Sequence, residues 1–385
     1  MSANGLTERE FAEIVAKNGG RVFRVGGSVR DQFMGRPSKD IDYSVVGMVR
    51  KNFQMLFPEA EDIGKAFPVF HLVIGGVKRE VAFARTEQKV GSGYKGFKIS
   101  AKPKITIEED LFRRDTTVNS MALDILTGEI IDPFQGRKDI DAKVLRATGQ
   151  HFSDDPMRAL RLAAQSARLG FAIDGDTLSL ARAAQAELAH EPVERVIHEL
   201  KVVLAEAPEP GQFFRVLEKT DLLQSIFNEV AALSFGEFEK IMAVLDSIAK
   251  ATQNSKVRFA TLGLVLDKER LEVWNDRMTL PGGWLEAAVT VSQVIGILKH
   301  PTPEKIVDTI NKLRRGSLTI EEFDLITRSA KLQIPQLEPL KAVMVLPKGV
   351  VAPATLQGKE IGAWWREQYV TVIAKQLHSG DSCTL

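Results

Sequence analysis

Cysteine is almost absent from this sequence, because Cys383, close to the C-terminus, is the only one in 385 residues. A single cysteine cannot form an intrachain disulfide or a thiolate metal site, so both are excluded. The six histidines include no pair at the spacing that places two metal ligands on one helix face. We therefore expect no zinc or other histidine-based metal centre.

Long hydrophobic runs are also missing. No uninterrupted apolar stretch approaches the roughly 20 residues that a membrane-spanning helix needs. The opening stretch MSANGLTEREFAEIVAKNGG lacks the basic-then-apolar layout of a signal peptide. We expect a cytoplasmic protein with no membrane partner.

Net charge is small, +1, but its distribution is uneven. Residues 78–104 contain eight Lys or Arg and two Glu, an excess of six positive charges, interleaved with Phe83, Tyr94 and Phe97. Clustered cations near aromatic rings are typical of a surface that binds a polyphosphate or a nucleic acid. A solvated basic loop is the alternative. In either case we expect a loop here, and its glycines would let it move over a binding site.

The chain changes character near residue 150. Up to about residue 135, short β-branched runs alternate with turns and short helical patterns, for example at 21–25, 41–47, 70–76 and 78–84. From Asp155 onward, apolar residues recur at helical spacing almost to the end. The pattern predicts an α/β head with a mixed, mainly antiparallel sheet, followed by an all-α part. We divide the chain into a head (1–137), a neck (138–205), a body (206–300) and a tail (301–385).

The stretch RVGGSVRDQFMGRPSKDIDYSVVG, residues 24–47, carries the first candidate site. If Asp40 and Asp42 lie on one strand, their carboxylates project from the same face. Two such carboxylates bind Mg²⁺ together with substrate phosphates at phosphoryl-transfer sites. Gly26 and Gly27 would let a phosphate approach the backbone at the start of a helix capped by Ser28, and Arg30 would add a guanidinium. A turn residue followed by a surface aspartate is the alternative interpretation.

A second constellation, EEDLFRRDTTVNSMALDI, spans residues 108–125. Arg114 has the chemistry to neutralise a phosphate, and Asp115 has the chemistry to accept hydrogen bonds from ribose hydroxyls, with Asn119 in support. A salt-bridged helix start is the alternative.

The third, FSDDPMRALRLAAQSARLGF at 152–171, places Asp155 and Arg158 three residues apart at a helix start. A carboxylate only accepts hydrogen bonds and a guanidinium only donates them. Side by side, the two match the amino group and ring nitrogen that cytosine and adenine present. They oppose the carbonyl and N–H of uracil and guanine, which leaves buried groups unsatisfied. A helix cap with an ion pair is the alternative.

Together these motifs resemble those of the class II CCA-adding tRNA nucleotidyltransferases and their poly(A) polymerase cousins, within the DNA polymerase beta superfamily. The resemblance implies that Asp40 and Asp42 bind the catalytic Mg²⁺ ions. We expect Glu80, on the neighbouring predicted strand, to supply a third carboxylate. The nucleotide-binding positions that it implies are Gly26, Gly27, Arg30, Arg114, Asp115, Asn119, Asp155, Arg158 and Arg161. It covers the first 230 residues closely and the remainder loosely.

Four positions depart from the family pattern. Asp154 stands where a glutamate is usual, and Ala164 with Gln165 replaces an arginine followed by an aromatic residue. Thr116 stands where an apolar residue is common. The loss of the third arginine puts one contact to phosphate or primer in doubt.

We accordingly expect template-independent addition and repair of the tRNA 3′-terminal CCA from CTP and ATP. The expected partner is tRNA, held by the helical part largely through shape and backbone contacts, with no obligate protein partner. A-only addition, CC-only addition and a poly(A) polymerase stay open as alternatives. So does a catalytically silent RNA-binding protein, although the retained pair of aspartates argues against it.

Overall fold

The computed structural model describes residues 5–38, 40–64, 68–91, 93, 96–188, 190–346 and 350–378. The chain divides into two compact units. Unit 1 consists of 1–192 and 219–225, and unit 2 of 193–218 and 226–385. Cys383 and Tyr94 lie outside the described residues. The four-part division stays a prediction.

Unit 1 is built around a seven-stranded sheet with the order β3-β4-β5-β2-β1-β8-β9. Only β2 and β5 pair in parallel among its neighbouring strands, so the sheet is mixed and mainly antiparallel, as predicted. Its strands are β1 (Arg21–Val25), β2 (Asp42–Val46), β3 (Glu61–Asp62), β4 (Val69–Ile74), β5 (Val77–Phe83), β8 (Ala122–Asp124) and β9 (Ile130–Ile131).

Two small sheets and a set of helices complete unit 1. The small sheets pair β6 (Thr86–Lys89) with β7 (Phe97–Ser100), and β10 (Val144–Leu145) with β11 (Ala172–Ile173). The helices are α1 (Glu8–Lys17), α2 (Gly27–Phe33), α3 (Arg50–Leu56), α4 (Ile107–Phe112), η1 (Thr117–Asn119), α5 (Gly136–Ala142), η2 (Gln150–Asp154), α6 (Met157–Leu169), α7 (Gly175–Ala183) and α8 (Gln185–Leu188).

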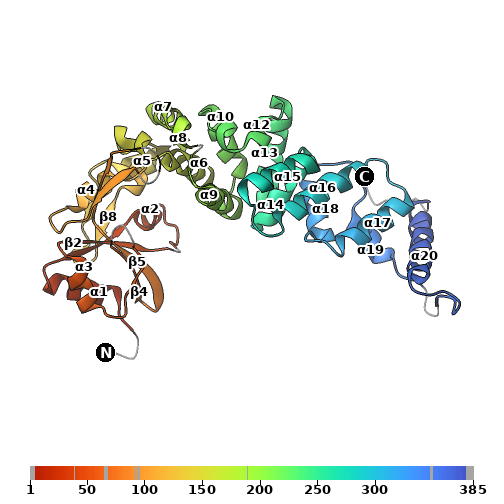
Figure 1. Ribbon diagram of the computed structural model, residues 1–385, viewed down its shortest axis with the longest axis horizontal. Helices are drawn as coiled ribbons and strands as arrows, with labels where there is room; N and C mark the ends of the chain where they lie inside the picture. The colour runs from red at the N-terminus through yellow and green to blue at the C-terminus, as the bar shows by residue number, and fades with distance from the viewer. Residues whose placement is uncertain are drawn as a thin grey trace. The chain divides into compact units, whose positions relative to one another are not determined.

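The main sheet is covered on both faces because its strands alternate apolar side chains between them. Phe11 of α1 and Phe53 of α3 pack edge to face with ring centroids 6.3 Å apart, in a core that also holds Tyr43 of β2. Phe23 of β1 and Leu111 of α4 belong to a separate cluster. Figure 1 shows α1 and α3 beside the strands of this sheet. Asp42, next to Tyr43 on β2, therefore faces away from the α1–α3 core.

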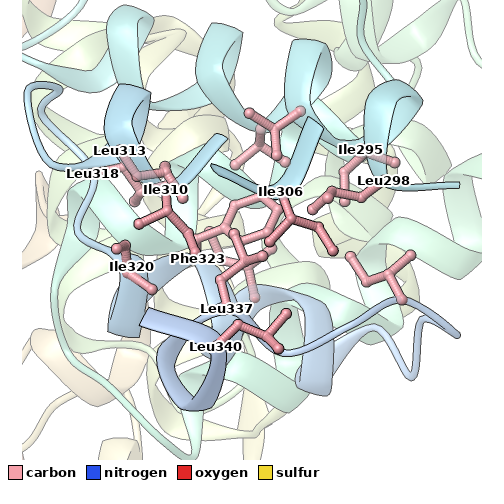
Figure 2. Close-up of a cluster of buried hydrophobic side chains, with 14 of the residues drawn as sticks. Ile295, Leu298, Ile306, Ile310, Leu313, Leu318, Ile320, Phe323, Leu337 and Leu340 are labelled. Atoms are coloured by element: carbon pink, nitrogen blue, oxygen red, sulfur yellow. The ribbon is translucent and has the colours of Figure 1, made fainter. Parts of the chain in front are cut away.

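Every element of regular secondary structure among the described residues of unit 2 is a helix. The segments assigned to it, apart from α11 (Leu223–Ile226) where the two units meet in sequence, are α9 (Val193–Glu206), α10 (Pro210–Lys219), α12 (Asn228–Ala231), α13 (Phe235–Ala249), α14 (Ser255–Ala260), η3 (Thr261–Leu264), α15 (Lys268–Met278), α16 (Trp284–Leu298), α17 (Pro303–Leu313), α18 (Ile320–Ser329), α19 (Leu337–Val343) and α20 (Lys359–His378). Figure 2 shows the core that joins α16 to α19, with Phe323 among isoleucine and leucine side chains. The predicted change from a mixed α/β part to an all-helical part is confirmed. Among the described residues, no helix combines the length and apolarity that crossing a membrane requires.

Candidate active site at the head of unit 1

Asp42 is the first residue of β2, and its neighbours in the sheet define the site. In register it pairs with Glu80 of the parallel strand β5 and with Val25 at the end of the antiparallel strand β1. Paired residues of adjacent strands project from the same face of a sheet. The structure thus brings Asp42 and Glu80 together, from strands almost forty positions apart in the chain.

Asp40 precedes β2 in a stretch without regular structure. The prediction that Asp40 and Asp42 lie on one strand is therefore wrong, because the ladder begins only at Asp42. The two carboxylates are nevertheless close enough for the charge of Asp40 to act on Asp42.

The electrostatics of Asp42 show crowding of like charge. Although the residue is exposed, the protein around it removes part of its hydration, which raises the pKa of the Asp42 carboxyl; the charges of Glu80 and Asp40 raise it further. Arg114 acts in the opposite direction and lowers that pKa. The net result is a raised pKa. A carboxylate in such surroundings gains from a bound cation, because the cation offsets the repulsion.

The donor set fits a hard divalent cation. Carboxylate oxygens are the ligands that Mg²⁺ takes, usually one or two from the protein with the remainder from water and substrate phosphates. Within the described part of the chain, no group of three or more His, Cys, Asp or Glu side chains is placed to hold a metal by itself. Asp40 and Asp42 therefore suit a cation that is bound partly by the phosphates of a substrate better than a cation that the protein alone coordinates.

Gly26 leaves room for Arg114 beside this carboxylate cluster. Its φ of 71° and ψ of −134° belong to a region that L side chains rarely adopt, and a Cβ atom there would lie 3.0 Å from Nη1 of Arg114. Nη2 of Arg114 donates to Asp110 at 3.1 Å, whereas its buried Nε has no hydrogen-bond partner among the described residues. An unpaired donor here is available to an anionic ligand.

Arg30 is less accessible than the sequence suggests. Its buried guanidinium donates to Asp31 at 2.7 Å and to Oδ1 of Asn119 at 2.7 Å. In this arrangement Arg30 orients Asn119. The prediction that Ser28 caps the helix is wrong, because α2 begins at Gly27 and the Ser28 hydroxyl donates to the Val25 carbonyl instead.

Asp115 is held by donors on both of its oxygens. Oδ1 accepts from the Thr116 amide at 2.8 Å and from Asn119 at 3.3 Å, while Oδ2 accepts from Gln165 at 3.0 Å. Nε of Arg161 lies 3.4 Å from Oδ2. Burial alone would raise the pKa of Asp115, but Arg161 and the hydrogen bonds outweigh it and lower the pKa. Asp115 is therefore an ionised acceptor with one edge, 12% exposed, toward solvent.

Asp155 and Arg158 both have partners, but they are not paired with each other in an ion pair. Asp155 accepts from the Met157 amide at 3.0 Å and from Arg161 at 3.2 Å. The buried Arg158 guanidinium donates to the carbonyl of Arg113 at 2.8 Å and to that of His151. Hydrogen bonds and ion pairs thus link Arg30, Asn119, Asp115, Arg161 and Asp155 in one continuous chain.

Two acidic residues that sequence reasoning missed organise the arginines. Asp110, 1% exposed, accepts from Arg113 at 2.9 Å and from Arg114 at 3.1 Å. Glu87 on β6 accepts from Arg113 at 3.1 Å and lies 3.9 Å from Arg158. The three- and four-residue spacing of Asp110 from the two arginines on a helix was the signal for the first. Nothing local in the sequence indicates the second.

Two short strands on either side of the centre of the basic segment form a hairpin. Strands β6 and β7 pair antiparallel from Thr86 opposite Ser100 to Lys89 opposite Phe97. Lys89 donates to Glu187 of α8 at 2.7 Å and to the Asp154 carbonyl at 2.9 Å. The prediction of a loop is therefore wrong for these two strands, since their backbone groups pair in an antiparallel ladder.

Comparison with known proteins places this geometry in a family. The poly A polymerase head domain matches residues 22–146, and the probable RNA and SrmB-binding site of polymerase A matches 170–233. The CCA-adding enzyme of Pseudomonas entomophila is 35% identical over 348 residues, 86% of this chain and 91% of that protein. The multifunctional CCA protein of Nitrosococcus oceani is 33% identical over 409 residues, 93% of this chain and 99% of that protein.

Solved structures agree on the fold. The Bacillus stearothermophilus CCA-adding enzyme in complex with CTP aligns with a TM-score of 0.68 at 24% identity, covering 99% of this chain and 94% of that one. A tRNA-processing enzyme in an apo form aligns with a TM-score of 0.68 at 25% identity, covering 95% and 96%. With relatives of such identity over most of both sequences, the chain belongs to the family of CCA-adding enzymes, nucleotidyltransferases with a poly(A) polymerase head domain.

Proposed function

We propose that this protein adds and repairs the 3′-terminal CCA of tRNA, taking CTP and ATP without a template and releasing pyrophosphate. The observation that carries the proposal is the carboxylate cluster of Asp42, Glu80 and Asp40 beside the partly unpaired guanidinium of Arg114. The names of relatives that match most of the chain support the reaction. The absence of a predicted membrane partner and the expected substrate favour the cytoplasm as its location.

Asp40 and Asp42 would hold Mg²⁺, and the charge of Glu80 would add to the negative potential at Asp42. When bound, Mg²⁺ would lower the pKa of the primer hydroxyl and neutralise charge on the phosphates. In the reaction the primer 3′-oxygen forms a bond to the α-phosphorus and loses its proton to water. The bond from that phosphorus to the bridging oxygen breaks, and pyrophosphate leaves.

The remaining residues bind and orient the nucleotide. Arg114 and Arg161 would contact phosphates, joined by Arg30 if it exchanges its protein partners for the ligand. The backbone at Gly26 and Gly27 would allow the phosphates to approach closely. Asp115, supported by Asn119, would accept from the ribose hydroxyls, which its lowered pKa favours.

Base selection would fall to Asp155 and Arg158. The carboxylate would accept from the amino group of cytosine or adenine, and the guanidinium would donate to the ring nitrogen beside it. The two carbonyl partners of Arg158 hold its side chain in place and leave further N–H groups for the base. The pair would reject uracil and guanine because like groups would face each other without water.

Purified protein tested on three tRNA transcripts would decide the function. The transcripts end before the CCA, after its first C and after CC, and each is supplied with CTP, ATP or both. We expect completion of CCA on all three. Addition only of A, only of C, or of long A tracts would replace the proposal with the corresponding alternative, and no incorporation would favour an RNA-binding protein.

A further inference from the structure

Two residues that depart from the family pattern contact each other behind Asp115. The Thr116 hydroxyl donates to Oε1 of Gln165 at 2.7 Å, and Nε2 of Gln165 donates to Oδ2 of Asp115 at 3.0 Å. The same hydroxyl also lies 3.4 Å from Oδ1 of Asp115, a longer and weaker contact. Thr116 is fully buried and Gln165 is 6% exposed. Gln165 lies on α6 and Thr116 immediately precedes η1, so the contact crosses 49 positions of sequence.

The hydrogen bonds from Thr116 through Gln165 to Asp115 form a relay, and hydrogen-bond chemistry permits only one direction for it. A carboxylate has no proton to give when ionised, so the amide nitrogen of Gln165 must face Asp115. The amide oxygen then points away and needs a donor, which the Thr116 hydroxyl supplies. A rotated amide would put its oxygen against the carboxylate and leave both unsatisfied in a buried place.

We propose that Thr116 and Gln165 are positioning residues for sugar selection: together they fix the Asp115 carboxylate in the orientation that accepts the ribose 2′-hydroxyl. The inference deepens the proposed function and rests on its assignment of Asp115 to the sugar. The Thr116 amide and Asn119 hold Oδ1, while Gln165 together with Arg161 holds Oδ2. Without Gln165, the carboxylate loses the neutral donor on Oδ2 and is free to turn toward Arg161.

The test compares incorporation of ATP and 2′-deoxyATP onto a CC-ended tRNA. The variants are Gln165→Met and Thr116→Val, which keep size and remove the relay, together with Thr116→Ser, which keeps the hydroxyl. We expect Gln165→Met and Thr116→Val to reduce the ratio of kcat/KM for ATP to that for 2′-deoxyATP by about tenfold, mainly through KM for ATP, as loss of a hydrogen bond to a charged group does. Thr116→Ser should keep the wild-type ratio.

Thr117→Val is the matched control. The Thr117 hydroxyl donates to Asp139 at 2.7 Å, from the neighbouring position and equally buried, yet away from Asp115. This variant should lose thermal stability to a similar extent and keep the ratio. If Gln165→Met and Thr116→Val also keep it, or if Thr117→Val reduces it as much, the relay has only a structural role and the inference is overturned.

The outcomes separate this inference from the proposed function. If the wild type incorporates ATP and discriminates against 2′-deoxyATP, and the relay variants discriminate equally well, only the inference is overturned. A wild type that incorporates neither nucleotide overturns both. Should Gln165→Met fail to fold, Thr116→Val carries the same expectation, because it removes the relay without touching the amide.

Discussion

Two buried charged groups of unit 2, Arg258 and Asp324, have partners of a different kind from those of the aspartates around the candidate site of unit 1. In unit 2, Arg258 is 2% exposed and donates to four backbone carbonyls, those of Leu204, Ala207, Ala249 and Thr252. Asp324 likewise accepts from two backbone amides, of Leu337 at 2.9 Å and Glu338 at 2.8 Å. Both residues serve the ends of helices, whose backbone groups lack partners inside the helix.

In unit 1, charged side chains face one another instead. Asp110 and Asp115 are surrounded by arginines, whereas Asp42 stands among other carboxylates. The comparison teaches that Arg258 and Asp324 satisfy backbone groups at helix ends, whereas the candidate site keeps carboxylates of like charge together around the exposed Asp42. Sites that bind charged ligands commonly retain such unfavourable arrangements.

The largest expected effect is on catalysis in unit 1. Asp42→Asn should reduce incorporation of CMP and AMP by about 10³-fold or more, the scale on which loss of transition-state charge stabilisation acts. Steady-state incorporation with radiolabelled CTP measures it. Asp62→Asn, at the end of β3, is the control and should leave incorporation unchanged. Near-wild-type activity of Asp42→Asn would contradict the proposal that Asp42 binds Mg²⁺.

The next effect concerns the scaffold of unit 2. Arg258→Met should lower the free energy of unfolding of this unit by about 3 kcal/mol, because several buried carbonyls lose their donor. Arg366→Met is the matched control on α20. Arg366 forms a surface ion pair with Asp308 at 2.6 Å, and its loss should cost less than about 1 kcal/mol. Urea unfolding would show whether the two losses differ; equal losses would contradict the role given to Arg258.

Lowering the pH should destabilise unit 1 more than unit 2. The pKa values of Asp110 and Asp115 are lowered in the fold, so their stabilising contribution is present above the ordinary Asp pKa and is lost as pH falls below it. Asp324 has a raised pKa, because burial outweighs its backbone donors, so its contribution has the opposite sign. Protection factors of the backbone amides, which correct for the slower intrinsic exchange in acid, should therefore fall about tenfold more in unit 1 between pH 7 and about 3.5. Equal decreases would contradict the contrast.

The smallest effect follows from the raised pKa of Asp42. A raised folded-state pKa means that the ionised group weakens the fold at neutral pH, and that the effect disappears as pH falls below the ordinary Asp pKa. Asp42→Asn should therefore raise the melting temperature at pH 7, and only slightly, because solvent screens the charge of this exposed carboxylate. Differential scanning calorimetry tests this. A lower melting temperature would show that Asp42 stabilises the head.

Sequence alone predicted the order of the fold, and the site residues that it named stay a prediction. Strand alternation and helical periodicity are local properties, so they identified the mixed sheet and the helical remainder. The sequence also placed Glu80 on the strand next to Asp42 and Asn119 in support of Asp115, and the structure pairs both. The contact of Gln165 with Asp115 and that of Glu87 with Arg158 were inaccessible, since these residues come together only through the tertiary fold.

Thermal unfolding in a Mg²⁺ titration with CTP present tests the carboxylate cluster most directly. A cation that relieves the repulsion around Asp42 stabilises the folded state by mass action. We predict a Mg²⁺-dependent rise in the melting temperature of the wild type and no such rise for Asp42→Asn. An equal rise in both proteins would place the cation elsewhere and contradict the account.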